Sequence, residues 1–197
     1  LGQERALRAA YASCALRPAD VSLVDCHATG TTVGDLAEVQ SMSRVFAEAP
    51  VAIGSLKSNL GHLITASGAA SLLKVTAAMD AGVLPPTLHV DEPLAELAGT
   101  QLRLIHRAEP WDAARRVAAI NNFGFGGNNA HLLVEQWTPR RPAVAVPAEA
   151  APPPDGPVAI VGVQVIAASA DQLAEFRRIL LSGASGLRPR DGGADWG

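Results

Sequence analysis

Two histidines, His27 and His62, are the first candidates for chemistry in this sequence, because each lies in a short polar motif. His27 belongs to a Cys-His-Ala-Thr-Gly-Thr sequence at residues 26–31, and His62 closes a Lys-Ser-Asn-Leu-Gly-His sequence at residues 57–62. A third motif, at residues 121–129, is rich in glycine and asparagine. Histidine can donate, accept or share a proton near neutral pH. These three segments therefore hold the candidate functional residues.

The adjacent Cys26 and His27 suggest, at first, a thiol nucleophile beside its base. Residues 21–26, however, have the composition of a buried strand, in which successive side chains point to opposite faces. Two neighbouring residues of such a strand are poorly placed to share a proton. The sequence therefore argues against Cys26 as a nucleophile.

A metal site and a phosphate-binding loop are two further possibilities. His27, His62 and His131 are possible zinc ligands, but no His-x-x-x-His pair and no carboxylate pattern accompanies them. The glycine-rich run lacks the Gly-Lys-Ser/Thr ending of a phosphate-binding loop, and no helix is predicted after it. We therefore expect no metal, and we expect His89, His106 and His131 to be structural or surface residues.

The composition is that of a well-packed protein and excludes several function classes. The 197 residues are 48% hydrophobic and 18% charged, which is unlike a disordered chain. A net charge of -3 without a basic run argues against nucleic-acid binding, and no apolar stretch approaches the ~20 residues that span a membrane. The two cysteines suggest a reducing, cytoplasmic setting. The chain does not begin with methionine, so we expect a piece of a longer protein.

Helices and strands are predicted to alternate along residues 1–137. Hydrophobic spacing predicts helices at 5–15, at 35–46 with Asp35 as its cap, and at 61–82, the last one apolar and deeply buried. Strands are predicted at 21–26, 51–55, 102–105, 117–120 and 130–135, the last two forming an antiparallel pair. This order predicts an α/β fold with a mixed five-stranded sheet and helices on both faces.

The composition changes abruptly after residue 137. Residues 138–157 are a predicted linker, since seven of the chain's 14 prolines fall within 139–157. A strand at 158–163 and a helix at 170–181 are predicted beyond it. About 40 residues are too few to bury a core alone. Residues 158–197 are therefore expected to begin another domain or to dock on the first.

The three motifs together resemble those of the β-ketoacyl synthases. Residues 27–31 resemble a His-Gly-Thr-Gly-Thr motif, residues 57–62 match Lys-Ser-Asn-x-Gly-His, and residues 123–129 resemble the last glycine-rich turn of these enzymes. The resemblance is closest to ketosynthase domains of multidomain polyketide and polyunsaturated fatty acid synthases. It implies a thiolase-like fold, of which residues 1–137 would be the C-terminal half. Residues 158–197 resemble the start of a second, divergent ketosynthase-like domain, for example a chain-length factor.

The resemblance implies an acyltransferase that performs a decarboxylative Claisen condensation. A cysteine in the first half of the domain, outside this chain, would hold the acyl group, and malonyl on acyl carrier protein would lose carbon dioxide and attack it. His27 and His62 would donate N–H groups to the malonyl thioester oxygen, and Lys57 would support them and hold their tautomers. The carrier protein supplies the phosphopantetheine arm, and no cofactor is expected on this chain. The parent would be a homodimer, and this fragment alone would be inactive.

The resemblance also implies residues that hold the substrate arm. Thr29 and Thr31 would hydrogen-bond the pantetheine, and Phe125 would gate the acyl pocket. The same turn contains Phe123, Gly124 and Gly126, where glycine permits a close backbone approach. The threonines are also compatible with turn formation alone, and Lys57 with an ordinary surface lysine.

Two departures from the family motif are present. Ala28 replaces the usual glycine, so its methyl group could narrow the pantetheine tunnel, and Cys26 stands where a small residue is usual. Neither change removes a catalytic group.

Two alternative functions remain at this point. A non-catalytic chain-length-factor-like or scaffold subunit would have the same fold, but such relatives usually lose the motif histidines, and both are present here. A thiolase would pair its histidine with a second cysteine in the C-terminal half. The glycine-rich run has Asn128 and Asn129 and no cysteine, which argues against a thiolase.

Overall fold

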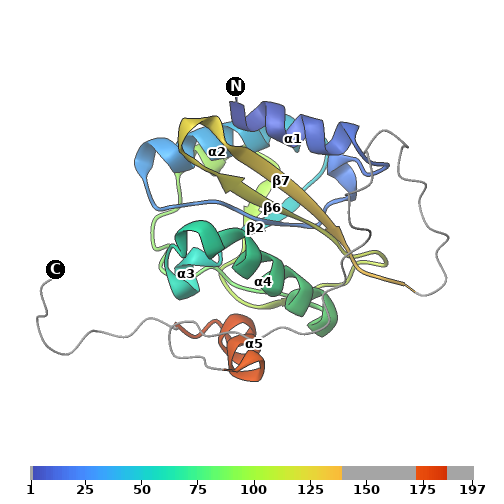
Figure 1. The fold of residues 1–197 in the computed structure, drawn as a ribbon, viewed down its shortest axis with the longest axis vertical. Helices are drawn as coiled ribbons and strands as arrows, with labels where there is room; N and C mark the ends of the chain where they lie inside the picture. The colour runs from blue at the N-terminus through green and yellow to red at the C-terminus, as the bar shows by residue number, and fades with distance from the viewer. Residues whose placement is uncertain (1, 139–171, 186–197) are drawn as a thin grey trace, which may run out of the picture.

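The computed structural model describes residues 2–138 and 172–185, and its centre is a five-stranded sheet (Figure 1). The strands are β1 (Leu23–Asp25), β2 (Val51–Gly54), β4 (Leu102–Leu104), β6 (Val117–Phe123) and β7 (Asn129–Glu135). They follow the order β4-β2-β1-β6-β7. The first four in this order are parallel, and β7 is antiparallel to β6. The predicted mixed sheet and its antiparallel last pair are confirmed.

Helices cover both faces of the sheet, as predicted (Figure 1). α1 (Gly2–Ala12) and α2 (Thr32–Val45) lie on one face, and α4 (Ser67–Ala81) lies on the other against β6. All residues of β1 and β2 are buried, because parallel strands at the centre of a layered fold are covered from both sides.

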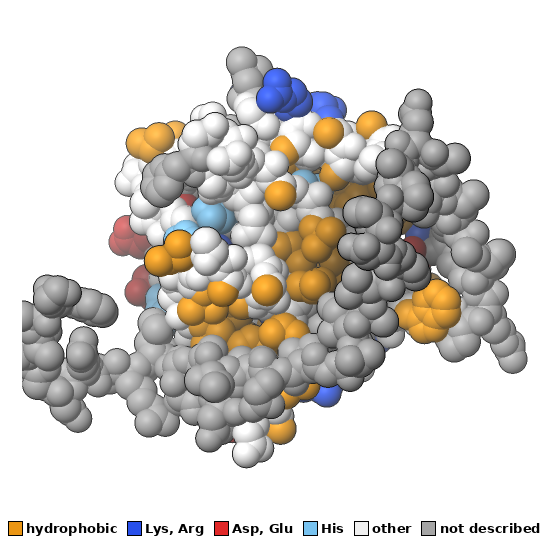
Figure 2. All heavy atoms as spheres, viewed as in Figure 1, with side chains coloured by type: hydrophobic (Ala, Val, Ile, Leu, Met, Phe, Trp, Pro, Cys, Tyr) orange, Lys and Arg blue, Asp and Glu red, His pale blue; other side chains and the backbone are white. Residues whose placement is uncertain are grey.

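Some large hydrophobic side chains reach the surface. The face drawn in Figure 2 has a cluster of hydrophobic side chains beside histidine side chains. The most exposed large hydrophobic residues of the described chain are Val33, Ile64, Leu132 and Trp137. Two of them, Val33 and Ile64, each come two residues after the end of a histidine motif.

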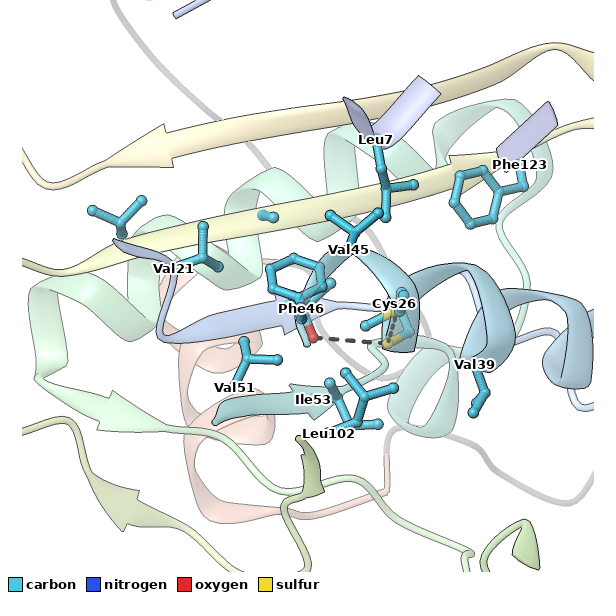
Figure 3. Close-up of a cluster of buried hydrophobic side chains, with 14 residues drawn as sticks. Leu7, Val21, Cys26, Val39, Val45, Phe46, Val51, Ile53, Leu102 and Phe123 are labelled. Atoms are coloured by element: carbon cyan, nitrogen blue, oxygen red, sulfur yellow. Dashed lines mark hydrogen bonds between the residues drawn. The ribbon is translucent and has the colours of Figure 1, made fainter. Parts of the chain in front are cut away.

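Alternate residues of the central strands enter two separate cores. Val24 and Ile53 pack with α1 and α2 in the cluster that Figure 3 shows, together with Leu7 and Phe46. Their neighbours Leu23 and Ala52 point to the other face and pack with Val75, Ala78 and Met79 of α4. This two-sided burial follows from the alternation of side chains along a strand.

The buried helix predicted at 61–82 is shorter than expected and begins at Ser67. Residues 57–60 form a separate helical turn, α3 (Lys57–Leu60), and Ile64–Ala66 form a 3-10 turn. Gly61 lies between them with φ 74°, a left-handed conformation that glycine adopts without steric cost. The predicted start of the helix was wrong because the spacing of apolar residues gives no indication that the backbone changes direction at Gly61.

Three smaller differences concern element ends. α2 begins at Thr32 with Thr31 at its N-cap, so Asp35 lies in the first turn and is not the cap. β6 extends to Phe123, three residues beyond its predicted end. A small antiparallel pair, β3 (Val83–Leu84) with β5 (Glu109–Pro110), was not predicted, because two-residue strands carry no readable pattern.

A helix from the C-terminal part of the chain packs against this body. α5 (Leu173–Ser182) places Phe176, Ile179 and Leu180 in one buried cluster with Leu56, Leu60 and Ala70. In Figure 1 it lies on the side of α4 that faces away from the sheet. The predicted helix at 170–181 is thus present with shifted ends, and it docks on the first domain. The predicted strand at 158–163 and most of the 138–157 linker lie outside the described residues.

No helix among the described residues is both long and apolar enough to cross a membrane.

Candidate active site

The three sequence motifs meet because each follows the carboxyl end of a parallel strand. His27 comes two residues after β1, Lys57 comes three residues after β2, and Gly124 directly follows β6. These three strands are neighbours in the sheet, and ligands bind α/β sheets in the crevice at this edge. The topology therefore explains why segments far apart in sequence form one site.

A cavity of about 930 Å³ lies at this edge, with both motif histidines in its wall. The ring centroids of His27 and His62 are 5.5 Å apart, and the two rings are nearly perpendicular at 86°. The Phe123 ring is 6.0 Å from His27. Further lining residues are Gln3, Thr29, Thr31, Gly34, Asp35, Glu38, Ile64, Thr65, Gly68, Asn122, Gly124, Asn128, Asn129 and Ala130.

The tautomer of His62 is set by its neighbours in the chain. The Ile64 backbone N–H donates to His62 Nδ1 at 3.0 Å, so this nitrogen is an acceptor and the ring proton is on Nε2. The Ser67 hydroxyl lies 3.1 Å from the same nitrogen. Ile64 has φ 51°, which is unusual for a β-branched residue, while its side chain is 77% exposed. The side chain gains little from this conformation, whereas the backbone uses it to reach His62.

The main chain at His27 is held by a buried carboxylate. Glu38 of α2 accepts the His27 N–H through Oε1 and the Ala28 N–H through Oε2, both at 2.8 Å. Ala28 has φ 28°, so the loop turns sharply there. Burial, together with the charges of the nearby Lys57 and His62, lowers the pKa of His27 to about 4. His27 is therefore a neutral imidazole at pH 7.

Lys57 lies near enough to the histidines for its charge to act on His27. Burial lowers the pKa of its ammonium group, and the charges of Asp25 and Glu38 oppose this effect. The contacts described at the His62 ring come from Ile64 and Ser67, and the expected role of Lys57 stays a prediction. What Lys57 contributes here is a partly buried positive charge beside the two rings.

The two motif threonines are partners of each other at the mouth of the cavity. Their Oγ1 atoms are 3.2 Å apart, and both residues line the cavity. Gly34 leaves room beside them, because a Cβ there would approach Thr31 Oγ1 to 2.5 Å. Exposed hydroxyls in this position are available to a polar ligand.

The glycine-rich run forms a tight turn between β6 and β7. The Gly124 N–H donates to the Asn128 carbonyl at 2.9 Å. Gly126 and Gly127 have φ of 73° and 83°, which side chains rarely permit. Phe123 is buried beneath the turn and faces His27, whereas the side chain of Phe125 is not among those described.

Cys26 is a core residue and does not face the cavity of the histidines. It is 7% exposed, and its Sγ lies 3.8 Å from Met42 Sδ in the cluster of Figure 3. Burial raises the pKa of the Cys26 thiol well above its usual value. A buried, protonated thiol that does not line the cavity cannot serve as a nucleophile with His27.

His131 belongs to a different environment from the other two histidines. Its Nδ1 lies 2.6 Å from Asn121 Oδ1, and its Nε2 lies 3.1 Å from the Tyr11 hydroxyl. Both ring nitrogens are thus occupied by protein groups. Within residues 2–138 and 172–185 no group of three or more His, Cys, Asp or Glu side chains is arranged to hold a metal ion.

Sequence reasoning missed the buried charges that support the site. Asp25 Oδ1 accepts the Lys74 ammonium at 2.5 Å and the Leu56 backbone N–H at 3.1 Å, with both charged side chains 1% exposed. This carboxylate connects β1 to α4 and to the start of α3, which carries Lys57. A lysine inside an apolar helix was the available signal, because such a residue needs a buried partner. No comparable sequence feature indicated that Glu38 is buried.

Comparisons with known proteins agree with this geometry. Residues 1–91 match the family described as beta-ketoacyl synthase, C-terminal domain. The polyketide synthase GfsA of Streptomyces halstedii is 41% identical over 167 residues, which is 80% of this chain and 2% of that protein. The highly reducing polyketide synthase sorA of Penicillium rubens is 41% identical over 138 residues, or 68% of this chain and 5% of that protein. The chain thus spans only a small part of the curated relatives it matches.

Solved structures of ketosynthases share the fold. The ketosynthase from module 6 of the bacillaene synthase of Bacillus subtilis 168 is 35% identical, with a TM-score of 0.66, and the match covers 70% of this chain and 26% of that one. A protein described as PfaC keto synthase–chain length factor is 37% identical, with a TM-score of 0.65, over 70% of this chain and 15% of that one. These likenesses confirm the predicted C-terminal part of a thiolase-like fold. This chain therefore contains the C-terminal part of a ketosynthase domain.

Proposed function

We propose that the protein containing this chain condenses a malonyl unit on acyl carrier protein with an acyl thioester, and that His27 and His62 stabilise the negative charge that develops during decarboxylation. One observation carries this proposal: two imidazoles, one neutral by burial and one held with its proton on Nε2, lie 5.5 Å apart in the wall of one cavity. Preorganised N–H donors in such a site stabilise an oxyanion strongly.

The chemistry divides between this chain and a nucleophile outside it. When the bond between the malonyl α-carbon and its carboxylate breaks, carbon dioxide leaves and the electron pair moves onto the α-carbon and the thioester oxygen. Hydrogen bonds from the histidines hold that oxygen as an enolate. The carbanion then attacks an acyl group on a cysteine thioester, and the cysteine leaves as a thiolate. Cys26 does not suit this nucleophile role, since it is a buried core residue.

Other residues of the cavity fit the binding of the carrier protein's phosphopantetheine arm. The hydroxyls of Thr29 and Thr31, which line the cavity, would hydrogen-bond its amide groups. The turn containing Phe123, Gly124, Phe125 and Gly126 lies beside the acyl group, with Phe125 as its gate. Lys57 adds a positive charge near the developing enolate.

The proposed domain organisation follows the composition of the chain. Residues 1–137 are the C-terminal half of a ketosynthase domain, residues 138–157 a linker, and residues 158–197 the start of a second ketosynthase-like domain. The proposed partners are acyl carrier protein, the N-terminal half of the domain and a second copy of the parent. A non-catalytic chain-length-factor-like subunit is the alternative, and the presence of both histidines in the cavity favours the enzyme.

The experiment uses a protein that carries the whole ketosynthase domain. Release of labelled carbon dioxide from malonyl carrier protein is measured for His27→Ala and His62→Ala. Each variant should lose about 10²–10³-fold in rate, while acyl loading detected by intact mass persists. His106→Ala is the matched control, because His106 is an exposed histidine outside the cavity. Decarboxylation at the wild-type rate in both site variants would refute the proposed role.

A further inference from the structure

A continuous chain of hydrogen bonds connects helix α1 to the loop that carries His27. Tyr11 Oη lies 3.1 Å from His131 Nε2, and His131 Nδ1 lies 2.6 Å from Asn121 Oδ1. Asn121 Nδ2 donates to Glu38 Oε1 at 2.8 Å. Glu38 in turn accepts the backbone N–H groups of His27 and Ala28. This series of hydrogen bonds thus links α1, β7, β6 and α2 to the site.

The direction of each bond in this chain is determined. The Asn121 amide nitrogen is directed at Glu38, so the oxygen of the same amide faces His131 and can only accept. His131 Nδ1 must therefore carry a proton. Burial lowers the pKa of His131 to about 4, so the ring is neutral at pH 7 and its Nε2 accepts from the Tyr11 hydroxyl. Burial also raises the pKa of Tyr11, which keeps that hydroxyl protonated.

Every hydrogen-bond donor in this series is directed toward the Glu38 carboxylate, and none is directed away from it. Three N–H groups reach this carboxylate: the Asn121 side chain and the backbone at His27 and Ala28. Asn121 and Glu38 are almost completely buried, so water cannot replace a lost member. The orientation of Glu38, and with it the sharp turn at Ala28, depends on the partner that holds Asn121.

We propose that His131 is a positioning residue for His27, acting through Asn121 and Glu38 as a neutral imidazole with its proton on Nδ1. His131 lies on β7 and contacts Asn121 and Tyr11, so its influence on the site passes through Glu38, which fixes the backbone of the His27 loop. Only the consequence for catalysis rests on the proposed function. The tautomer of His131 and the hydrogen bonds by which Glu38 holds the His27 loop are properties of the folded chain.

The first test reads the tautomer of His131 directly, in folded protein without substrate. Nitrogen-15 correlation spectra of histidine-labelled chain 1–197 at pH 7 should show a neutral His131 with the proton on Nδ1. Tyr11→Phe should leave this tautomer in place, since Asn121 determines it. A wild-type His131 that is protonated, or that carries its proton on Nε2, would overturn the proposal even if no variant could be purified.

The second test follows the loop and then the reaction. In His131→Phe and Asn121→Leu, amide hydrogen exchange at His27 and Ala28 should become roughly 10-fold faster, and His106→Phe should not change it. In a protein with the whole ketosynthase domain, His131→Phe should lower kcat for decarboxylation with little change in KM. Unchanged amide hydrogen exchange at His27 and Ala28 in a folded His131→Phe protein would contradict the proposed restraint of the loop. If wild type released no carbon dioxide, the proposed function would fail while the tautomer and exchange results would stand.

Discussion

At the scale of single residues, two buried ionisable groups control how this structure responds to its conditions. His131 and Lys74 are both nearly inaccessible to water, but the fold accommodates the two ionisable groups in different ways. The imidazole is kept neutral by burial, whereas the ammonium has a carboxylate partner. Each case leads to a separate prediction.

His131 makes stability depend on pH in the acidic range. Its pKa is about 4 in the folded chain and 6.5 in the unfolded chain, so the unfolded state binds more protons between these values. The free energy of unfolding should therefore fall as pH decreases from 6.5 to 4, by about 3 kcal/mol from this group. Burial raises the pKa of Glu38, which opposes the fall. Urea titrations of wild type and His131→Gln isolate the His131 contribution, since the difference between them should shrink in acid, and His106→Gln should behave as wild type.

The Asp25–Lys74 pair should behave as a unit. Asp25→Asn and Lys74→Met each leave one buried group without its partner, so each should lower the free energy of unfolding by about 3–5 kcal/mol. The double variant should lose clearly less than the sum of the two, because neither charge then remains unpaired. Chemical denaturation of all four proteins measures this coupling. Additive losses would show that the two side chains do not form the buried pair.

At the scale of elements, the geometry of the candidate site depends on where short helical segments end. The reversal at Gly61 separates α3 from α4 and places His62 where Ile64 and Ser67 can reach its ring. α5 adds a second support, since it packs on Leu56 and Leu60 at either end of α3. The carbonyl of Ala184, two residues after α5, accepts a hydrogen bond from Asn59. The segment between Lys57 and His62 is thus held from the sheet side and from α5.

Docking of α5 should contribute measurably to stability. Phe176 is 1% exposed in the cluster with Leu56 and Leu60, so Phe176→Ala should lower the free energy of unfolding by about 3 kcal/mol. Arg177→Ala is the matched control, because this neighbouring side chain is exposed on the same helix. Thermal unfolding of the two variants makes the comparison. Equal melting temperatures would mean that α5 does not dock as described.

At the scale of the whole molecule, the site is expected to need a second segment for activity. Purified chain 1–197 should not become acylated by an acyl thioester, since its buried thiol is unreactive and its other cysteine, Cys14, follows α1 by two residues and does not line the cavity. Intact mass spectrometry tests this. Adding the N-terminal half of the ketosynthase domain, expressed separately, should restore both acylation and decarboxylation. An acyl adduct on chain 1–197 alone would contradict the division of the chemistry.

The sequence predicted the layers of the fold well, and it was weaker where the backbone departs from regular periodicity. Largely apolar runs at residues 21–26 and 51–55 located the central strands, because strands covered on both faces are mostly apolar. Apolar periodicity also located α4, but it placed the start six residues too early, because Gly61 and the Ile64 turn interrupt the helix. Left-handed backbone at a β-branched residue has no sequence signature.

The sequence by itself determined which residue types can do the chemistry: two histidines in polar motifs, two hydroxyls beside the first one, and a glycine-rich turn. The amino-acid sequence of the motifs contains this information because catalysis needs particular functional groups. Only the tertiary structure decided how those groups are held. It brought three strand ends to one edge, placed the His62 proton on Nε2, and joined His131 to the His27 loop through Asn121 and Glu38. Hydrogen-bond direction depends on which partners meet in space, and residues as far apart as Tyr11 and His131 meet only in the folded chain.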